Sequence, residues 1–164
     1  MKILVFSDSH GTLSFMRHCV EAIQPDAVIH LGDHYHDGQD IQEEFPHIPL
    51  HQVPGNCDLY RGWISDPETR LLELGGVRLL VTHGHRHGVK QTLLRLLADA
   101  RASKVDAVLF GHTHMAVCQK EDNLWVLNPG SAGSYSGSAG IMEIQDGKII
   151  NCRIITAADL EEMV

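Results

Sequence analysis

The sequence lacks the features that would indicate a membrane protein, a disulfide-stabilised fold or a nucleic-acid-binding surface. Its four cysteines are scattered without a CxxC pair, so no zinc knuckle or redox motif is readable and a reducing cytoplasm is expected. No apolar run is long enough for a signal peptide or a membrane span. The net charge of −8 offers no general attraction for a nucleic-acid backbone or an anionic membrane. These absences predict a soluble, cytoplasmic protein with neither membrane binding nor strong nucleic-acid binding.

The first two-thirds of the chain alternates strand and helix patterns. Residues 3–6 and 26–31 are apolar runs typical of buried strands, and residues 12–23 between them have helical apolar spacing, with Thr12 or Ser14 as the cap. Further strands are predicted at residues 48–53, 70–74, 77–81, 105–110, 116–119, 124–127, 140–144 and 149–155. Helices are predicted at 40–45 and 90–102, and loops at 34–39, 61–66 and 128–138. The last four strands look like a meander. We expect a single α/β domain over residues 1–164, with two packed sheets flanked by helices.

Histidine is abundant, at 12 residues, which is about two to three times its ordinary usage. Several of these histidines lie in polar motifs that follow predicted strands. The motifs are Asp8-x-His10, Gly32-Asp33, Gly55-Asn56, His83-Gly84-His85 and Gly111-His112-Thr113-His114. Open α/β sheets bind their ligands at the carboxyl ends of strands, and imidazole with carboxylate suits Mn, Fe, Zn or Ni rather than Ca or Cu(I). The motifs therefore predict a metal site.

Seven candidate ligands are too many for one tetrahedral ion, and they suit two ions that share a carboxylate. The candidates are Asp8, His10, Asp33, Asn56, His83, His112 and His114. Two ions roughly 3.5–4 Å apart clamp a phosphate, lower the pKa of a bridging water and stabilise in-line displacement at phosphorus. They would also supply the local positive charge that the acidic chain lacks. We expect two divalent metal ions per chain, manganese foremost, with iron, nickel and zinc as alternatives.

The ordered motifs resemble those of the calcineurin-like metallophosphoesterase superfamily. Gly55-Asn56-Cys57-Asp58 and Asn128-Pro129-Gly130-Ser131 are similar to its YfcE-type phosphodiesterase branch. The resemblance implies a four-layer α/β/β/α sandwich of two mixed β-sheets flanked by helices, with a dinuclear metal centre at the strand ends. It implies that one metal is held by Asp8, His10, Asp33 and His114, and the other by Asp33, Asn56, His83 and His112. Asp33 would then bridge the two ions, and Asn56 would lie near the phosphate oxygens.

One residue departs from the pattern of the wider superfamily. Cys57 stands where that pattern usually has a histidine that stabilises the transition state or protonates the leaving group. A neutral thiol is a weak hydrogen-bond donor, although the YfcE-type branch shares this cysteine. His85 and Asp58 lie next to the ligands and are candidates for positioning or proton transfer. The predicted catalytic set is therefore Asp33, Asn56, Cys57, Asp58 and His85.

The function that this resemblance implies is a metal-dependent phosphodiesterase. Hydroxide activated by the metals would attack phosphorus in a small phosphodiester or nucleotide-like substrate. A phosphomonoesterase or dinucleoside polyphosphate hydrolase is the alternative enzyme. A non-catalytic metal-binding scaffold, like the Vps29 relatives that use this fold for protein assembly, is the alternative from another class. Whether the chain forms a homo-oligomer is left open.

Three further histidines lie near the predicted site in the sequence. His34 and His36 are able to touch a substrate, but a polar loop without a specific role is the simpler interpretation. His30 falls inside a strand pattern, so an ordinary packing or surface role is expected for it.

Overall fold

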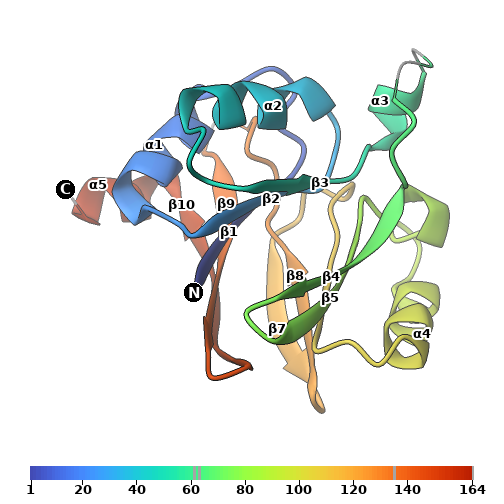
Figure 1. Cartoon of the computed structure of the whole chain (residues 1–164). Helices are drawn as coiled ribbons and strands as arrows, with labels where there is room; N and C mark the ends of the chain where they lie inside the picture. Colours follow the sequence, from blue (N-terminus) through green and yellow to red (C-terminus); the bar gives the residue numbers. More distant parts are fainter. Residues whose placement is uncertain (61, 63, 135, 164) are drawn as a thin grey trace.

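Apolar strands from both ends of the chain form the first sheet, in the order β10-β9-β1-β2-β3. The computed structural model describes residues 1–60, 62, 64–134 and 136–163. The strands of this sheet are β1 (Lys2–Phe6), β2 (Ala27–His30), β3 (Leu50–Gln52), β9 (Ser138–Gln145) and β10 (Lys148–Thr156). β1, β2 and β3 are parallel, whereas β9 pairs antiparallel with both β1 and β10. The sheet is therefore mixed (Figure 1).

The second sheet has the order β4-β5-β6-β8-β7. Its strands are β4 (Thr69–Leu74), β5 (Val77–Thr82), β6 (Ala107–Leu109), β7 (Val117–Glu121) and β8 (Leu124–Asn128). β4 and β5 form a hairpin across Gly75 and Gly76, and β6 runs parallel to both β5 and β8. β7 returns antiparallel to β8, so this sheet is mixed as well.

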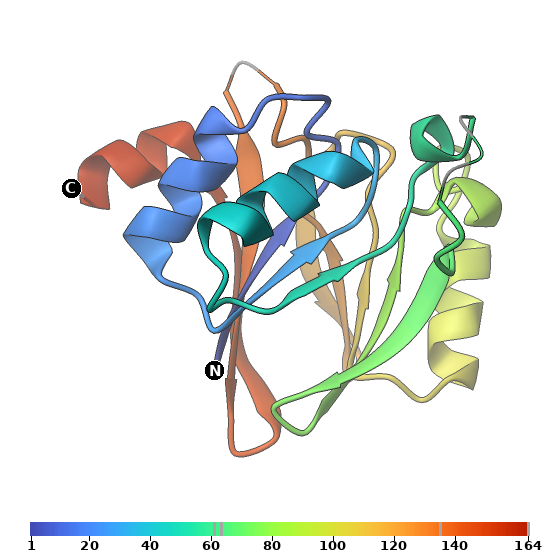
Figure 2. The ribbon, with the colours of Figure 1, turned by 45° about the horizontal axis from the view of Figure 1, so that its top comes forward.

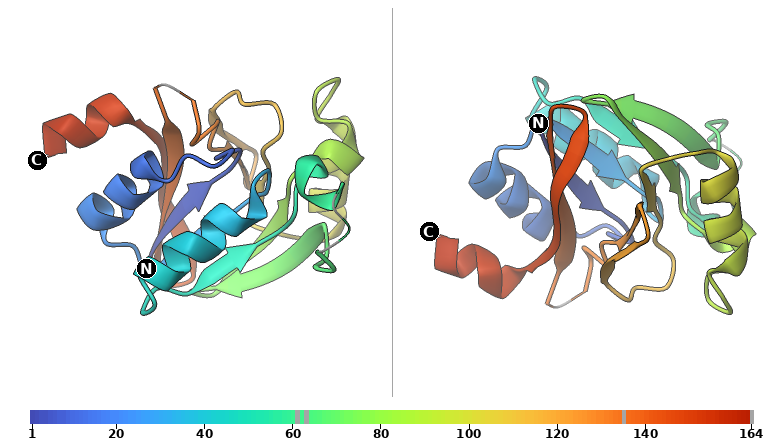
Figure 3. Two further views of the ribbon diagram at one scale, coloured as in Figure 1. Left: turned by 90° about the horizontal axis from the view of Figure 1, so that it is seen from above. Right: turned by 90° about the horizontal axis from the view of Figure 1, so that it is seen from below.

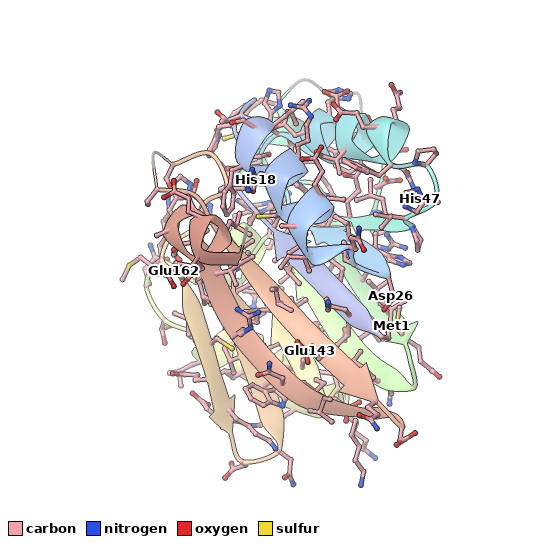
Figure 4. The ribbon with its side chains drawn as sticks, turned by 90° about the vertical axis from the view of Figure 1, so that its left-hand side faces the viewer. Met1, His18, Asp26, His47, Glu143 and Glu162 are labelled. Carbon is pink, nitrogen blue, oxygen red and sulfur yellow. The ribbon has the colours of Figure 1, made fainter. Side chains whose placement is uncertain are left out.

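Helices cover the outer faces of both sheets (Figures 2 and 3). The helices are α1 (Ser14–Ile23), α2 (Tyr35–Glu44), α3 (Asn56–Leu59), α4 (Leu94–Ala102) and α5 (Ala157–Met163), with a short 3₁₀ turn η1 at His85–His87. α1, α2 and α5 pack on the first sheet, and Figure 4 shows α1 beside α5 on this face. α4 packs on the second sheet, and a separate apolar core lies between the sheets. The predicted α/β fold of two mixed sheets flanked by helices is confirmed.

The predicted meander is wrong. β7 and β8 pair with each other in the second sheet, whereas β9 and β10 belong to the first. Apolar alternation identifies a strand, but it carries no information on which sheet the strand joins. Cys118 of β7 and Cys152 of β10 come within 3.1 Å of each other, where the edge strands of the two sheets meet.

Some helix boundaries also differ from the sequence prediction. α2 begins at Tyr35 rather than at residue 40, α4 begins at Leu94 rather than at residue 90, and α5 was not predicted. The N-cap of α1 is Leu13, which makes no side-chain capping bond, so the predicted cap at Thr12 or Ser14 is wrong. Positions 61 and 63 of the predicted loop that ends at residue 66, and position 135 of the predicted loop that ends at residue 138, lie outside the described residues. Within the described part of the chain, no helix is long and apolar enough to cross a membrane.

Close backbone contacts join the carboxyl ends of neighbouring strands. The Asp8 N–H donates to the Gly32 carbonyl over 2.9 Å, and the Gly111 N–H donates to the His83 carbonyl over 3.0 Å. Gly32 has a φ of +97°, and a Cβ there would collide with the backbone of Gly55. Glycine is therefore required at position 32 for two reasons: the left-handed backbone conformation, and the close approach of the turn that follows β3.

Replacing Gly32 tests this close approach. We expect Gly32→Ala to lower the free energy of unfolding by about 3 kcal/mol or more, because strain and a backbone collision add. Gly62→Ala is the matched control, since Gly62 has a φ of +64° but no atom of the described residues lies within 4 Å of the added Cβ. The control should lose about 1 kcal/mol in urea unfolding. Equal losses in the two variants would contradict the packing requirement.

His30 is fully buried in β2 and carries no metal-binding role in the prediction. Its Nε2 lies 2.9 Å from Ser9 Oγ, and its Nδ1 accepts the Gly32 N–H over 3.2 Å. Burial lowers the pKa of His30 to about 4, against an ordinary value of 6.5. The folded chain therefore holds this ring in its neutral form.

The buried ring makes stability depend on pH. Because the unfolded chain binds this proton at higher pH than the folded chain, the contribution of His30 is complete above pH 6.5 and is lost as pH falls toward 4. We expect a loss of about 2 kcal/mol between pH 7 and pH 5 in urea unfolding, and a smaller loss in His30→Gln. The exposed His18 provides the control, and His18→Gln should keep the wild-type pH dependence. An unchanged pH dependence in His30→Gln would refute the assignment.

Candidate metal centre

Asp8, His10 and His114 form the first group of candidate ligands, each offering one atom within 4.8 Å of the others. Asp8 and His10 follow β1, and His114 follows β6. His114 Nε2 lies 3.1 Å from Asp8 Oδ1 and 3.4 Å from His10 Nε2. The second oxygen of Asp8 accepts hydrogen bonds from the Ser7 hydroxyl (2.6 Å) and the His112 N–H (3.0 Å). These bonds fix the carboxylate so that Oδ1 faces the two imidazoles.

Asp33, His83 and His112 form the second group. His83 Nε2 lies 3.4 Å from Asp33 Oδ2 and 3.2 Å from His112 Nδ1. The other ring nitrogen of His83 lies 2.8 Å from the Leu31 carbonyl, which can only accept a hydrogen. The carbonyl therefore holds a proton on Nδ1, so that Nε2 is the nitrogen that a metal ion would contact.

The two groups adjoin each other. Asp8 Oδ1 lies 3.9 Å from His83 Nε2, so an atom of the first group is close to the centre of the second. Among the described residues Asp33 belongs to the second group only, and its bridging role stays a prediction. The structure thus brings six of the seven predicted ligands into two neighbouring clusters.

Asn56 is the seventh predicted ligand. Its Oδ1 is buried and has no hydrogen-bond partner in the described part of the protein. A buried amide oxygen without a partner is costly, and a cation would satisfy it. This atom, together with six nitrogen and oxygen donors, fits divalent transition metals rather than a thiolate site.

Five of the ligand positions have an unusual backbone conformation. The φ angles are positive at Asp8 (54°), His10 (47°), Asp33 (56°), His112 (69°) and His114 (59°), although none is glycine. Such residues cost of order 1–3 kcal/mol each and cluster at functional sites. The sharp turns that follow β1, β2 and β6 bring these side chains together at the carboxyl ends of these strands.

Asp58 fixes the turn that carries Asp33. Its Oδ2 accepts the N–H groups of Asp33 (2.9 Å) and Gly55 (2.7 Å). Its Oδ1 accepts the N–H groups of His34 (3.0 Å) and Tyr35 (2.8 Å). A carboxylate with four backbone donors joins the turn after β2 to the turn after β3. Of the two roles proposed for Asp58, positioning is the one that this arrangement supports.

The charges in the second group influence one another. Burial acts to raise the pKa of Asp33, but the hydrogen bond and charge of His83 outweigh it and hold this pKa below the usual range. Burial and the neighbouring His83 lower the pKa of His112 to about 4. His112 is therefore neutral at pH 7, with a lone pair available to a metal ion.

The other two catalytic candidates flank the second group. The His85 ring centroid lies 5.6 Å from that of His83 and 6.2 Å from that of His112. His85 Nε2 is 3.0 Å from Glu68 Oε2, at an angle that makes no hydrogen bond. The Cys57 N–H donates to Asp33 Oδ1 over 3.0 Å. Burial and the Asp33 carboxylate raise the pKa of Cys57 to about 11, so the thiol is neutral and a weak donor at pH 7.

Residues near His34 form a pocket that sequence reasoning did not predict. It has a volume of about 230 Å³ and is lined by His10, His34, Tyr35, His36, Cys57, Asp58 and Ile64. His36 therefore lies in α2 rather than in the predicted polar loop, whereas His34 precedes the helix as its N-cap. The spacing of His34 and Asp37, one helical turn apart, was the available signal.

Sequence comparison finds relatives over most of the chain. Residues 1–147 match the family described as the calcineurin-like phosphoesterase superfamily domain. A probable metallophosphoesterase of Bacillus subtilis, YsnB, is 37% identical over 137 residues, covering 80% of this chain and 75% of that protein. The phosphodiesterase YfcE of Escherichia coli is 26% identical over 160 residues, covering 84% and 82%.

Solved structures share the fold. A predicted phosphoesterase of Streptococcus pneumoniae superposes with a TM-score of 0.76 at 26% identity, covering 94% of this chain and 88% of that chain. A variant of Entamoeba histolytica Vps29 superposes with a TM-score of 0.70 at 23% identity, covering 95% and 99%, which shows the fold alone. With its sequence match over residues 1–147, the chain belongs to the calcineurin-like phosphoesterase superfamily, in the YfcE-type branch.

Proposed function

We propose that the protein is a divalent-metal-dependent phosphodiesterase that hydrolyses small phosphodiesters or nucleotide-like substrates in the cytoplasm. The observation that carries this proposal is the pair of adjoining groups, Asp8–His10–His114 and Asp33–His83–His112. The unpartnered Asn56 Oδ1 adds a further donor. Relatives named phosphodiesterase support the preference for diesters. Manganese is the proposed metal, with iron, nickel and zinc as alternatives.

Different residues of the site have different proposed roles in the reaction. Two divalent cations, when bound, would supply positive charge for the phosphate and lower the pKa of a water. Asp33 is proposed as the ligand common to both cations, and the Cys57 N–H and the turn held by Asp58 keep it in place. Asn56 is proposed to lie near the phosphate oxygens. His85 remains a candidate for proton transfer beside the second group.

The alternatives differ in what they require of the site. A phosphomonoesterase or dinucleoside polyphosphate hydrolase would use the same ligands on a different substrate. A scaffold like Vps29 has no need of a complete ligand set, and all seven predicted ligands are present in this chain. This complete set favours an enzyme.

Activity toward a chromogenic diester tests the proposal. We expect the manganese-loaded protein to hydrolyse bis-p-nitrophenyl phosphate, and Asp33→Asn to lower kcat by about 10³-fold or more, because an amide lacks the charge of the proposed shared ligand. His47→Gln is the control, since the exposed His47 precedes β3, whereas the site lies after the carboxyl end of that strand. Full activity in Asp33→Asn with a normal unfolding midpoint would contradict the mechanism. A faster rate on p-nitrophenyl phosphate in the same preparation would favour the monoesterase.

Metal analysis tests the two groups separately. We expect the wild-type chain to retain two manganese ions after gel filtration, His114→Ala to retain one, and Asp33→Asn to retain neither, because Asp33 is the proposed shared ligand. Plasma emission spectrometry would measure the ratio of metal to protein. Retention of one ion by Asp33→Asn would refute bridging. Failure of the wild-type chain to retain any metal would favour the scaffold.

A further inference from the structure

His34 is held by hydrogen bonds from both its backbone and its ring. Its backbone has a φ of +86°, and its N–H donates to Asp58 Oδ1 over 3.0 Å. Its ring Nδ1 lies 2.8 Å from Asp37 Oδ1. Asp37 is 2% exposed, and its other oxygen accepts the Gly11 N–H over 2.8 Å. A half-exposed histidine is thus fixed by a buried carboxylate, at the cost of backbone strain.

The fixed ring presents its other nitrogen beside the first candidate metal group. A Cβ on Gly11, the residue after His10, would lie 3.9 Å from His34 Nε2 and 3.8 Å from Cε1. His34 shares the 230 Å³ pocket with His10 and Cys57. This pocket therefore adjoins the place between the metal groups where a phosphate would bind. One ester group of that phosphate would lie in the pocket.

The lining of the pocket indicates which ester group fits. His36 repeats the arrangement of His34, with its Nδ1 held 2.7 Å from Gln39 Oε1. The Nε2 atoms of His34 and His36 are therefore available for a hydrogen bond with a ligand. A hydroxyl group can donate to or accept from such a nitrogen, whereas an alkyl group would leave it without a partner. Among the described residues that line the pocket, Ile64 alone is aliphatic.

We propose that His34, positioned by Asp37, contacts the ester group of the substrate beyond the phosphate and selects hydroxyl-bearing groups such as a nucleoside over alkyl groups. This inference rests on the proposed phosphodiesterase function. His34 is a specificity-determining residue that touches substrate, and Asp37 is a positioning residue that acts through it.

Two substrates with one leaving group test the selection. We compare the p-nitrophenyl ester of thymidine monophosphate with methyl p-nitrophenyl phosphate, both with the manganese-loaded full-length chain. Wild type should favour the thymidine ester by about 10-fold in kcat/KM. His34→Asn should raise KM for that ester by about 10-fold, with kcat and the methyl ester changed by less than about 2-fold. Asparagine tolerates the left-handed backbone of position 34, so the fold should be kept.

Two further variants distinguish the loss of a substrate contact from a general change in structure. Asp37→Asn should raise KM for the thymidine ester by about 3-fold, because a neutral amide binds the ring more weakly than a carboxylate does. His47→Asn should match wild type on both esters. Manganese content and unfolding midpoint are measured for every variant. If His34→Asn loses manganese, the KM of Asp37→Asn for the thymidine ester decides whether the ring contacts the substrate. Equal KM values in wild type and variants for the thymidine ester would overturn the proposal.

Nucleotide binding distinguishes this inference from the proposed function. Calorimetry measures the binding of thymidine monophosphate to the manganese-loaded wild type and to His34→Asn. If wild type hydrolyses neither ester, the phosphodiesterase proposal fails, while about 10-fold weaker nucleotide binding in His34→Asn would still support the pocket. If the esters are hydrolysed but nucleotide binding is equal in both proteins, the inference fails and the proposed function stands.

Discussion

A buried carboxylate between two sheets is the constraint on which this site depends. Asp8 is fully buried, and a buried charge is stable only when opposite charge and hydrogen bonds compensate its lost hydration. Ser7 and the His112 backbone satisfy one of its oxygens, whereas the other faces His114 and, farther away, His83. The same carboxylate therefore holds the ends of β1 and β6 together through one oxygen and directs its other oxygen at two clusters of imidazole. The divalent cations proposed above would complete this arrangement.

Assembling the clusters requires a strained backbone, and the surrounding contacts hold that strain in place. Asp33 and His34 are consecutive residues with positive φ, and neither is glycine. The four N–H groups that Asp58 accepts include those of both residues. Gly32 and Gly55 allow the turns after β2 and β3 to touch, so that this carboxylate can reach across. Because strain and its compensation lie in the same few residues, changes there should affect folding and ligand geometry together.

Most of the fold and most of the candidate site could be predicted from the sequence, because both depend largely on local patterns. Strands and ligand motifs are local patterns, so the strand ends that carry Asp8, Asp33 and His112 could be predicted without knowing their neighbours. The assignment of β9 and β10 to the first sheet could not, because sheet membership is a long-range pairing. The role of Asp58 was hidden for the same reason, since three of the backbone groups it binds lie 23 to 25 residues away. Asp37 binds Gly11 at a separation of 26 residues.

The two candidate metal groups differ in how far their side chains are exposed to solvent. In the second group the side chains of His83 and Asp33 are 0% and 5% exposed, so solvent reaches them poorly. In the first group His10 and His114 are 41% and 49% exposed. Catalytic metal sites keep an open position for substrate or water, whereas closed sites do not. The first group is therefore the side from which a substrate can approach. The pocket formed by α2 and α3 lies on that same side, because His10 belongs to both.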